Sequence, residues 1–399
     1  MRQRNSPPPP ARSSAWVRYP FLSSTSTNAF YVYYANASQV DQQNKTAVWN
    51  PEYAGVWHLN VTAGQHSDST ANGNVSTAVD VQLQGTAAGQ IDGADEFSSG
   101  STDEVTVGDS NSLDVSRLTI SLWMKLSVIP TEDHGILAKV HLTENQYGLI
   151  LAYNNRLCFV RNDAGSGCTP LGTFQANTAY FVVATNKGFG ASNAACYING
   201  QLTQQISGSD ISPSTGNLLI GDTMYWSNFD GIIDEVRISN VARSASWIST
   251  EYNNQSSPST FMSFGVEETT DRGAQVSARS DTLSDSRPGQ PSNHTFTFTV
   301  NHAIEASTTL VFSWPAGFSF TQSPAWYDAS WAYGRKITLD SALIAGTEDL
   351  LNFPVLVSST IVDWRHTDYG GHVNSATGWD FVSTASDGTT KLDHEIEAL

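Results

Sequence analysis

Charged residues are scarce in this sequence, and basic residues are the scarcest of them. Asp, Glu, Lys and Arg make up 15% of the 399 residues, compared with about 25% in average globular domains. Lys and Arg together number 20 whereas Asp and Glu number 38, so the formal net charge is −18 at pH 7. Because such an acidic chain repels nucleic-acid phosphates and anionic membrane surfaces, we expect no nucleic acid among its partners.

Long apolar runs are missing as well. No run approaches the roughly 18 apolar residues of a transmembrane helix, so we expect no membrane insertion. The basic start, followed by Pro7 to Pro10, lacks the apolar centre of a secretory signal, and we expect residues 1–13 to be disordered. Low Lys content and many Ser, Thr and Asn residues fit a secreted β protein. We therefore expect an extracellular or cell-surface location, with any export signal encoded upstream.

Cysteine is also rare, with three residues in the chain. Cys158 and Cys168 flank a predicted strand end and a Gly-rich turn, so a hairpin disulfide between them is plausible in an oxidising compartment. Three buried thiols, with Cys196 as the third, are an equally good interpretation at this point. The cysteines do not have the spacing of a zinc site.

Short alternating or apolar runs fill the chain from about residue 14 onward, separated by Gly, Asn, Ser and Asp. This spacing predicts an all-β protein built from sandwiches or barrels. The pair Asn199-Gly200 predicts a tight hairpin turn. One helix is predicted over Ala242–Asn253, where Trp247 and Ile248 fall on the same face as residues three or four positions later.

Several motifs between residues 47 and 266 occur in a consistent order. They are Trp49, Gly55-Val-Trp-His58, Asp68-Ser-Thr-Ala-Asn-Gly-Asn74, Thr119-Ile-Ser-Leu-Trp123 and the long run from Phe229 to Arg243. Together they resemble the laminin-G-like jelly roll of the concanavalin A-like superfamily. The resemblance implies a concanavalin A-like jelly-roll sandwich over residues 47–266, accompanied by smaller β-sandwich modules. It says much less about function, since one fold supports many functions.

The two chain ends carry motifs that look like two parts of one domain in reversed order. The C-terminal part, residues 325–399, contains Trp331-Ala-Tyr333, Asn352-Phe-Pro-Val-Leu-Val357 and His394-Glu-Ile-Glu397; the N-terminal part, residues 14–46, contains Trp16-Val-Arg-Tyr-Pro20 and Tyr31-Val-Tyr-Tyr-Ala-Asn36. Read in that order they resemble the uncharacterised bacterial domain of unknown function 2341 (DUF2341). Ala35 stands where the family is expected to have Gly, so we expect a less sharply left-handed turn there.

Half of such a domain would expose unpaired strand edges and an apolar face. We therefore expect either that the two parts meet within one chain, or that one chain accepts the N-terminal strands of the next in head-to-tail self-association. A further segment, residues 270–323, resembles the small immunoglobulin-like segments of bacterial surface proteins. It has room for only about four strands.

We find no catalytic signature in the sequence. A nucleophile elbow, a zinc-protease helix motif, a phosphate-binding loop and a Rossmann glycine pattern are all missing. Asp234 and Glu235 are adjacent, so in a regular strand they would point to opposite faces and could not act as a glycosidase pair. We therefore predict no catalytic residues.

A calcium site is the better chemical hypothesis. Calcium prefers six to eight oxygen ligands on flexible turns, and the turn from Asp68 to Asn74 offers carboxylate, amide and backbone oxygens. The jelly-roll resemblance places this turn near Asp234 and implies Asp68, Asn72, Asn74 and Asp234 as ligands. In the alternative, the turn residues cap their own backbone, and Asp234 pairs with Arg237 or Arg243.

Two aromatic residues, Tyr225 and Trp226, occupy a polar loop and are the candidate ligand-binding residues, because exposed aromatic rings commonly contact sugars or protein partners. Core packing is the alternative for Trp226. Trp57, Trp123 and Trp247 lie in apolar runs and are predicted to be buried. The expected ligand is an extracellular glycan or protein.

Three functions remain for the whole chain. The first, which we favour, is a non-catalytic adhesive or structural segment of a secreted or cell-surface bacterial protein, with a jelly roll that binds glycan or protein and that calcium could support. The second is a carbohydrate-binding module of a polysaccharide-degrading enzyme. The third, a glycosidase, lacks a suitable carboxylate pair.

Overall fold

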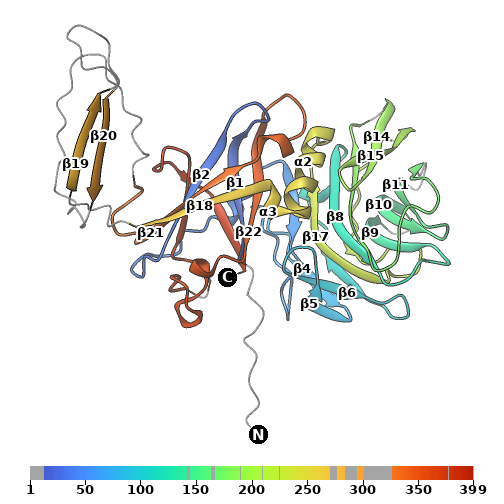
Figure 1. The fold of residues 1–399 in the computed structure, drawn as a ribbon. Helices are drawn as coiled ribbons and strands as arrows, with labels where there is room; N and C mark the ends of the chain where they lie inside the picture. Colours follow the sequence, from blue (N-terminus) through green and yellow to red (C-terminus); the bar gives the residue numbers. More distant parts are fainter. Residues whose placement is uncertain are drawn as a thin grey trace.

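The computed structural model describes residues 13–398, except residues 142–143, 163–166, 189, 209, 224, 270–275, 284–293, 301–325 and 376. Strands dominate this part of the chain, and antiparallel sheets form two β-sandwiches that lie side by side (Figure 1). This arrangement confirms the all-β prediction.

Two large sheets form the first sandwich, a jelly roll. Alternation of apolar and polar residues along the strands turns one apolar face of each sheet inward, and Trp57, Leu122 and Phe159 are fully buried between them. The seven-stranded sheet contains, in spatial order, β12 (Gly167–Cys168), β11 (Arg156–Arg161), β10 (Glu144–Ala152), β9 (His134–His141), β16 (Leu218–Ile220), β7 (Glu104–Val107) and β4 (Ser76–Asp80). The eight-stranded sheet contains β15 (Gln201–Gly208), β14 (Gly190–Ile198), β13 (Ala179–Asn186), β8 (Leu118–Leu126), β17 (Gly231–Ser239), β6 (Gly93–Phe97) and β5 (Leu83–Ala88), with β3 (Tyr53–Trp57) paired to β17.

The hairpin, the helix and the buried tryptophans predicted for this part of the chain are all present in the structure. Asn199 and Gly200 connect β14 to β15 with φ of 49° and 75°, as a two-residue hairpin requires. The predicted helix is α2 (Ala245–Ser256), which begins where the Ser244 hydroxyl accepts a hydrogen bond from the Trp247 amide. Trp57, Trp123 and Trp247 are all buried, as predicted.

The two ends of the chain together form the second sandwich. Strands β1 (Ser13–Leu22) and β2 (Asn28–Tyr34) come from the N-terminal part, and each lies between strands of the C-terminal part. The three-stranded sheet has the order β22 (Leu350–Ser359), β1, β25 (His394–Ala398); the five-stranded sheet has the order β18 (Met262–Thr269), β21 (Tyr333–Leu339), β2, β23 (Phe381–Thr384), β24 (Lys391–Leu392). The blue and red strands therefore interleave in Figure 1.

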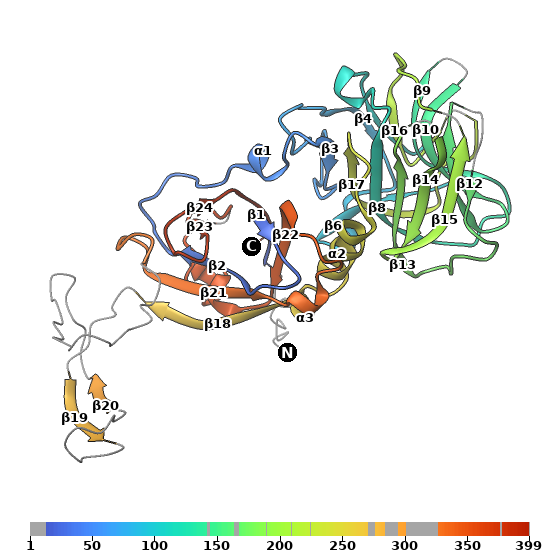
Figure 2. The ribbon, with the colours of Figure 1, turned by 90° about the horizontal axis from the view of Figure 1, so that it is seen from above.

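The boundary between the two sandwiches differs from the expected residues 46 and 266. Strand β18 pairs with β21 of the second sandwich from Met262 onward, so the jelly roll ends before Met262. Trp49, which belongs to the jelly-roll motifs, packs in the core of the second sandwich beside Trp16, with ring centroids 5.4 Å apart. Helix α2 packs against β22 and β15 and so lies where the sandwiches meet, whereas α1 (Lys45–Val48) and α3 (Pro258–Phe261) pack on strands of the second sandwich (Figure 2).

The expected immunoglobulin-like segment is described only in part. Strands β19 (Val276–Leu283) and β20 (His294–Val300) pair with each other as a two-stranded sheet. Its remaining motif, near residues 309–318, and the start at residues 1–12 lie outside the described residues. Across the described ranges, no helix is both long and apolar enough to span a membrane.

Because both parts of the second sandwich belong to one chain, we predict a monomer. Size-exclusion chromatography with light scattering should give a mass near 43.1 kDa at every protein concentration. Exchange of β1 and β2 between chains would preserve the same strand pairing but join separate molecules. Species that grow with protein concentration would therefore contradict pairing within the chain.

Ala35 adopts a left-handed backbone with φ of 64°, so the expected weakening of this turn does not occur. A side chain with a Cβ costs about 1–2 kcal/mol in this conformation. We predict that Ala35→Gly is at least as stable as the natural protein, whereas Ala35→Val, whose branched side chain is an outlier there, is less stable by about 1 kcal/mol or more. Chemical denaturation would measure this order, and a Val variant as stable as the natural chain would contradict it.

Candidate functional site

The predicted disulfide partners lie opposite each other in the seven-stranded sheet. Cys158 of β11 is the register partner of Cys168 of β12, and the structure joins them by a disulfide. Cys196 is free and buried, and burial raises the pKa of its thiol to about 12. A buried thiol with such a pKa is a poor nucleophile.

The predicted ligand-binding aromatics lie in the loop that follows β16. The side chain of Tyr225 is 47% exposed, and its ring stands nearly perpendicular to that of Trp226, with centroids 6.0 Å apart. Trp226 packs against an apolar cluster on the outer face of β10 and β11, close to Cys158 and Cys168. Trp226 is therefore partly a packing residue, whereas Tyr225 presents an exposed ring.

Other exposed apolar side chains gather at this end of the sheet. Tyr153, at the turn between β10 and β11, is 62% exposed, and Leu171 is 67% exposed. Asp133 ties the region together because its carboxylate accepts from the Tyr153 amide and its carbonyl accepts from the Ser227 amide. The amide of Gly172 donates a hydrogen bond to the carbonyl of Asn154. This bond brings the adjacent residues Leu171 and Tyr153 close to each other. We call Tyr153, Leu171, Tyr225 and Trp226 the rim surface.

A groove of about 550 Å³ opens on the outer face of the same sheet. Its walls include Thr106, Val140 and Leu219, which alternate along their strands with core residues. Two carboxyl groups, Glu104 and Asp222, also line it. Partial burial, with the negative charge of Glu104, raises the pKa of Asp222 to about 7. The sequence search missed this pair because the two residues are far apart along the chain.

The predicted calcium turn is held together by hydrogen bonds within the protein. The carboxylate of Asp68 accepts from the backbone amides of Val56, Thr70 and Asn74 and from the Thr70 hydroxyl, at 2.8–3.0 Å. Asn72 and Asn74 turn their amide nitrogens toward backbone carbonyls. These bonds match the turn-capping alternative. Calcium binding at this turn stays a prediction.

Asp234 has different partners from either alternative drawn from the sequence. Its Oδ2 accepts from the backbone amides of Gln90 and Ile91 at 2.7 and 2.9 Å. Arg237 pairs with Glu235 and Glu251, and Arg243 pairs with Glu52. Among the described residues, no hydrogen bond or ion pair connects Asp234 to the Asp68 turn. The loop that precedes β6 thus donates the hydrogen bonds that hold the Asp234 carboxylate.

The Asp68 turn can be tested by substitution. Because Asp68→Ala leaves three backbone amides without an acceptor, we expect it to lower the free energy of unfolding by about 3 kcal/mol. The matched variant Asn72→Ala, on a more exposed residue, should cost less. Urea unfolding of chelator-treated protein, with and without added calcium, measures both changes. A loss that appears only in calcium would support the calcium role instead.

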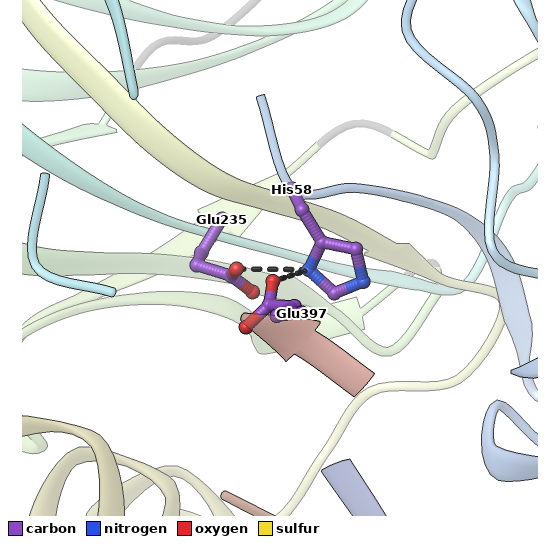
Figure 3. Close-up of side chains that lie close together, drawn as sticks. All are labelled: His58, Glu235 and Glu397. Atoms are coloured by element: carbon purple, nitrogen blue, oxygen red, sulfur yellow. Dashed lines mark hydrogen bonds and ion pairs between the residues drawn. The ribbon is translucent and has the colours of Figure 1, made fainter. Parts of the chain in front are cut away.

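A second polar group, which the sequence search did not identify, lies where the two sandwiches meet. His58 follows β3, Glu235 belongs to β17 and Glu397 belongs to β25, and their side chains converge (Figure 3). The Nδ1 atom of His58 is 2.8 Å from Glu235 and 2.6 Å from Glu397. All three side chains are at least nine-tenths buried. We call these three residues the junction cluster.

The surroundings of the junction cluster are charged and aromatic. Arg237 forms ion pairs with Glu235 and Glu251, and its guanidinium lies 4.3 Å from the ring centroid of Trp16. Strand β17 bulges between Asp234 and Arg237, and Glu235 has φ of 54°. A residue held in this uncommon conformation requires support from its neighbours. The bulge is what allows Glu235 to face His58.

The electrostatics of the cluster follow from burial and from neighbouring charge. Burial opposes protonation of His58, but the carboxylates of Glu235, Glu397 and Glu395 outweigh it and raise the pKa of His58 well above its usual value. Burial and the charge of Glu235 raise the pKa of Glu397. Burial alone would also raise the pKa of Glu235, but His58 and Arg237 lower it.

A third group, Glu267, Asp363 and His372, lies on the second sandwich and is more exposed. Glu267 accepts hydrogen bonds from Tyr34 and interacts with His372, each at 2.7–2.8 Å, and Arg335 pairs with Asp363. These side chains therefore have protein partners already.

Comparison with known proteins identifies the jelly roll. Residues 99–249 match a family model described as the concanavalin A-like lectin/glucanases superfamily. The match lies within the first sandwich and confirms the concanavalin A-like jelly roll predicted from the sequence. No curated protein gives a significant match to the chain.

Solved structures with a similar fold come from several kinds of protein. Trypanosoma rangeli sialidase is 13% identical with a TM-score of 0.41, and the alignment covers 55% of this chain and 36% of that chain. Domain 4 of AbnA, an extracellular arabinanase from Geobacillus stearothermophilus, is 17% identical with a TM-score of 0.39, covering 49% of this chain and 96% of that chain. The receptor-binding domain of botulinum neurotoxin D is 19% identical with a TM-score of 0.40, covering 52% and 53%. These likenesses concern the fold alone, and this chain spans 36% of the sialidase chain.

Proposed function

We propose that this chain is a non-catalytic segment of a secreted or cell-surface bacterial protein, and that its jelly roll binds an extracellular glycan. The observation that carries the proposal is the rim surface, which places exposed aromatic and aliphatic side chains beside the loop that borders the open groove. The second sandwich serves to hold the jelly roll in place and contributes to an adhesive or structural role.

The chemistry of these two surfaces suits a sugar ligand. A sugar ring has apolar faces that stack on aromatic side chains, and hydroxyl groups that need hydrogen-bonding partners. Tyr225 and Tyr153 supply exposed rings, while Thr106, Asn217 and the two carboxyl groups of the groove supply polar atoms. The combination of apolar platform and polar groove is what a neutral glycan requires.

A glycosidase is the second candidate, favoured by the raised pKa of Asp222 in the groove. A raised pKa at one carboxyl group is not sufficient, because a glycosidase needs two carboxyl groups placed on either side of the scissile bond. A non-catalytic carbohydrate-binding module of a polysaccharide-degrading enzyme is compatible with the same surface.

The role of the rim surface is testable on a glycan array. Because the Tyr225 side chain is 47% exposed, Tyr225→Ala should keep the fold and weaken glycan binding roughly tenfold through lost stacking. Trp226→Ala should weaken binding too, but also disturbs the cluster beneath it. Phe21→Ala removes a ring on the second sandwich that is more exposed than Tyr225, at 64% against 47%, and should leave binding unchanged.

The same samples separate the candidate functions. Bound oligosaccharide should remain intact, and Asp222→Asn should not change that result. Release of new reducing ends, abolished by Asp222→Asn, would establish the glycosidase instead. Absence of binding to every glycan on the array would contradict the glycan proposal and leave a structural role.

A further inference from the structure

The junction cluster contains a buried carboxylate, Glu397, that forms an ion pair with His58 without filling its hydrogen-bonding capacity. The side chain of Glu397 is 2% exposed, and neither of its oxygens receives a hydrogen bond from the described residues. Its carboxylate forms an ion pair with Nδ1 of His58 at 2.6 Å. That nitrogen already forms a hydrogen bond with Glu235 at 2.8 Å. Because one imidazole nitrogen carries at most one proton, it cannot donate to both carboxylates.

The three side chains do have the arrangement that a metal ion needs. Their candidate ligand atoms, one imidazole nitrogen and two carboxylate oxygens, all lie within 4.8 Å of one another. Zinc and similar ions bind such nitrogen and oxygen ligands at about 2.0–2.2 Å. An ion placed among them would bond to Nδ1 and to both carboxylates, and would satisfy the oxygens of Glu397 that lack donors.

We propose that the junction cluster is a binding site for a divalent transition-metal ion, held by His58, Glu235 and Glu397. Imidazole favours transition metals such as zinc over calcium and magnesium, which prefer all-oxygen sites. This site is distinct from the calcium turn predicted from the sequence, and it is independent of the proposed glycan surface.

His58 has a carboxylate near its second ring nitrogen, as metal-binding histidines commonly do. The other ring nitrogen of His58, Nε2, lies 3.4 Å from Glu395. Glu395 is itself held by the Ser69 hydroxyl at 2.6 Å and by the Trp49 indole at 2.8 Å. A carboxylate on the second ring nitrogen fixes the ring orientation and leaves Nδ1 free to bind metal.

Space for a fourth ligand and a route of entry lie next to the cluster. A pocket of about 220 Å³ is bordered by His58 and Glu397 and by polar residues of the 66–69 turn. Its remaining walls include Lys45, Asn60 and Glu395. A water molecule in this pocket would complete a four-coordinate site of three protein ligands and one water.

The charge balance at the junction also favours a cation. Four carboxyl groups, those of Glu235, Glu251, Glu395 and Glu397, are buried here beside one guanidinium, that of Arg237. Excess buried charge of one sign is costly unless it is paired or coordinates a metal. A divalent ion bound to His58, Glu235 and Glu397 would supply positive charge among these carboxyl groups.

Metal binding would connect the two sandwiches. His58 and Glu235 belong to the jelly roll, and Glu397 belongs to the second sandwich. An ion that binds only the assembled junction stabilises that assembly by mass action. Zinc at about a hundred times its dissociation constant should raise the melting temperature of the chain by roughly 5 °C.

The test is titration of the chelator-stripped, full-length chain with Zn²⁺ by calorimetry and thermal unfolding. We expect one equivalent to bind and the melting temperature to rise. Glu397→Gln keeps the size and shape of the side chain, so it should fold normally and bind zinc at least tenfold more weakly. The matched control Glu267→Gln alters the other His/carboxylate group and should bind zinc like the natural chain. His58→Asn offers a second variant of the site.

Each result bears on the proposal. X-ray absorption of the zinc-bound protein should show one imidazole nitrogen and two or three oxygens at about 2.0–2.2 Å. No zinc binding by the natural chain, equal binding by Glu397→Gln, or a sulfur ligand would overturn the proposal. Loss of binding in Glu267→Gln alone would place the ion at the other group, and a response to calcium in preference to zinc would also overturn it.

Discussion

The guanidinium of Arg237 is the buried charge on which the arrangement of the two sandwiches depends. It lies against the rings of both Trp16 and Trp49, at 4.3 and 5.0 Å from their centroids, and pairs with Glu235 and Glu251. Trp16 comes from the second sandwich, whereas Arg237 comes from the central strand of the jelly roll. Removing any one partner would leave a buried charge unpaired, which costs more than the ion pair contributes. The two sandwiches are therefore joined through a shared interior.

The bulge in β17 determines how this interior is used. A regular strand would point Asp234 and Glu235 to opposite faces, and the sequence was interpreted in that way. In the structure the left-handed conformation of Glu235 and the register shift after Asp234 break that alternation. Bulges often re-aim side chains near functional sites. Here Asp234 accepts hydrogen bonds from a backbone loop, and the bulge turns Glu235 toward His58 at the junction with the second sandwich.

The parts of the molecule that the sequence predicts are those specified by local pattern. The hairpin at Asn199, the helix that begins after Ser244 and the jelly roll all depend on residues close together in the chain. Tryptophans in apolar runs were correctly predicted to be buried. In each case one segment carries both the signal and the structure.

The features that the sequence does not predict depend on contacts between distant segments. Glu104 meets Asp222, and His58 meets Glu397, only because strands from separate parts of the chain become neighbours. No spacing rule describes such pairs. The end of the jelly roll was placed too late for a similar reason, since β18 looks like any other strand until its partner β21 is known.

The position of β1 and β2 has a consequence for how the protein is made. Each is flanked on both sides by strands of the C-terminal part, and Tyr34 pairs with Tyr333, 299 positions later. During synthesis the jelly roll can fold as soon as its own strands leave the ribosome, since domains generally fold as units. The apolar strands that contain Trp16 and Phe30 must wait for their partners Leu356 and Ile337, which are translated 340 and 307 positions later. The second sandwich therefore forms late, by closure of a very large loop, a step that contact order predicts to be slow.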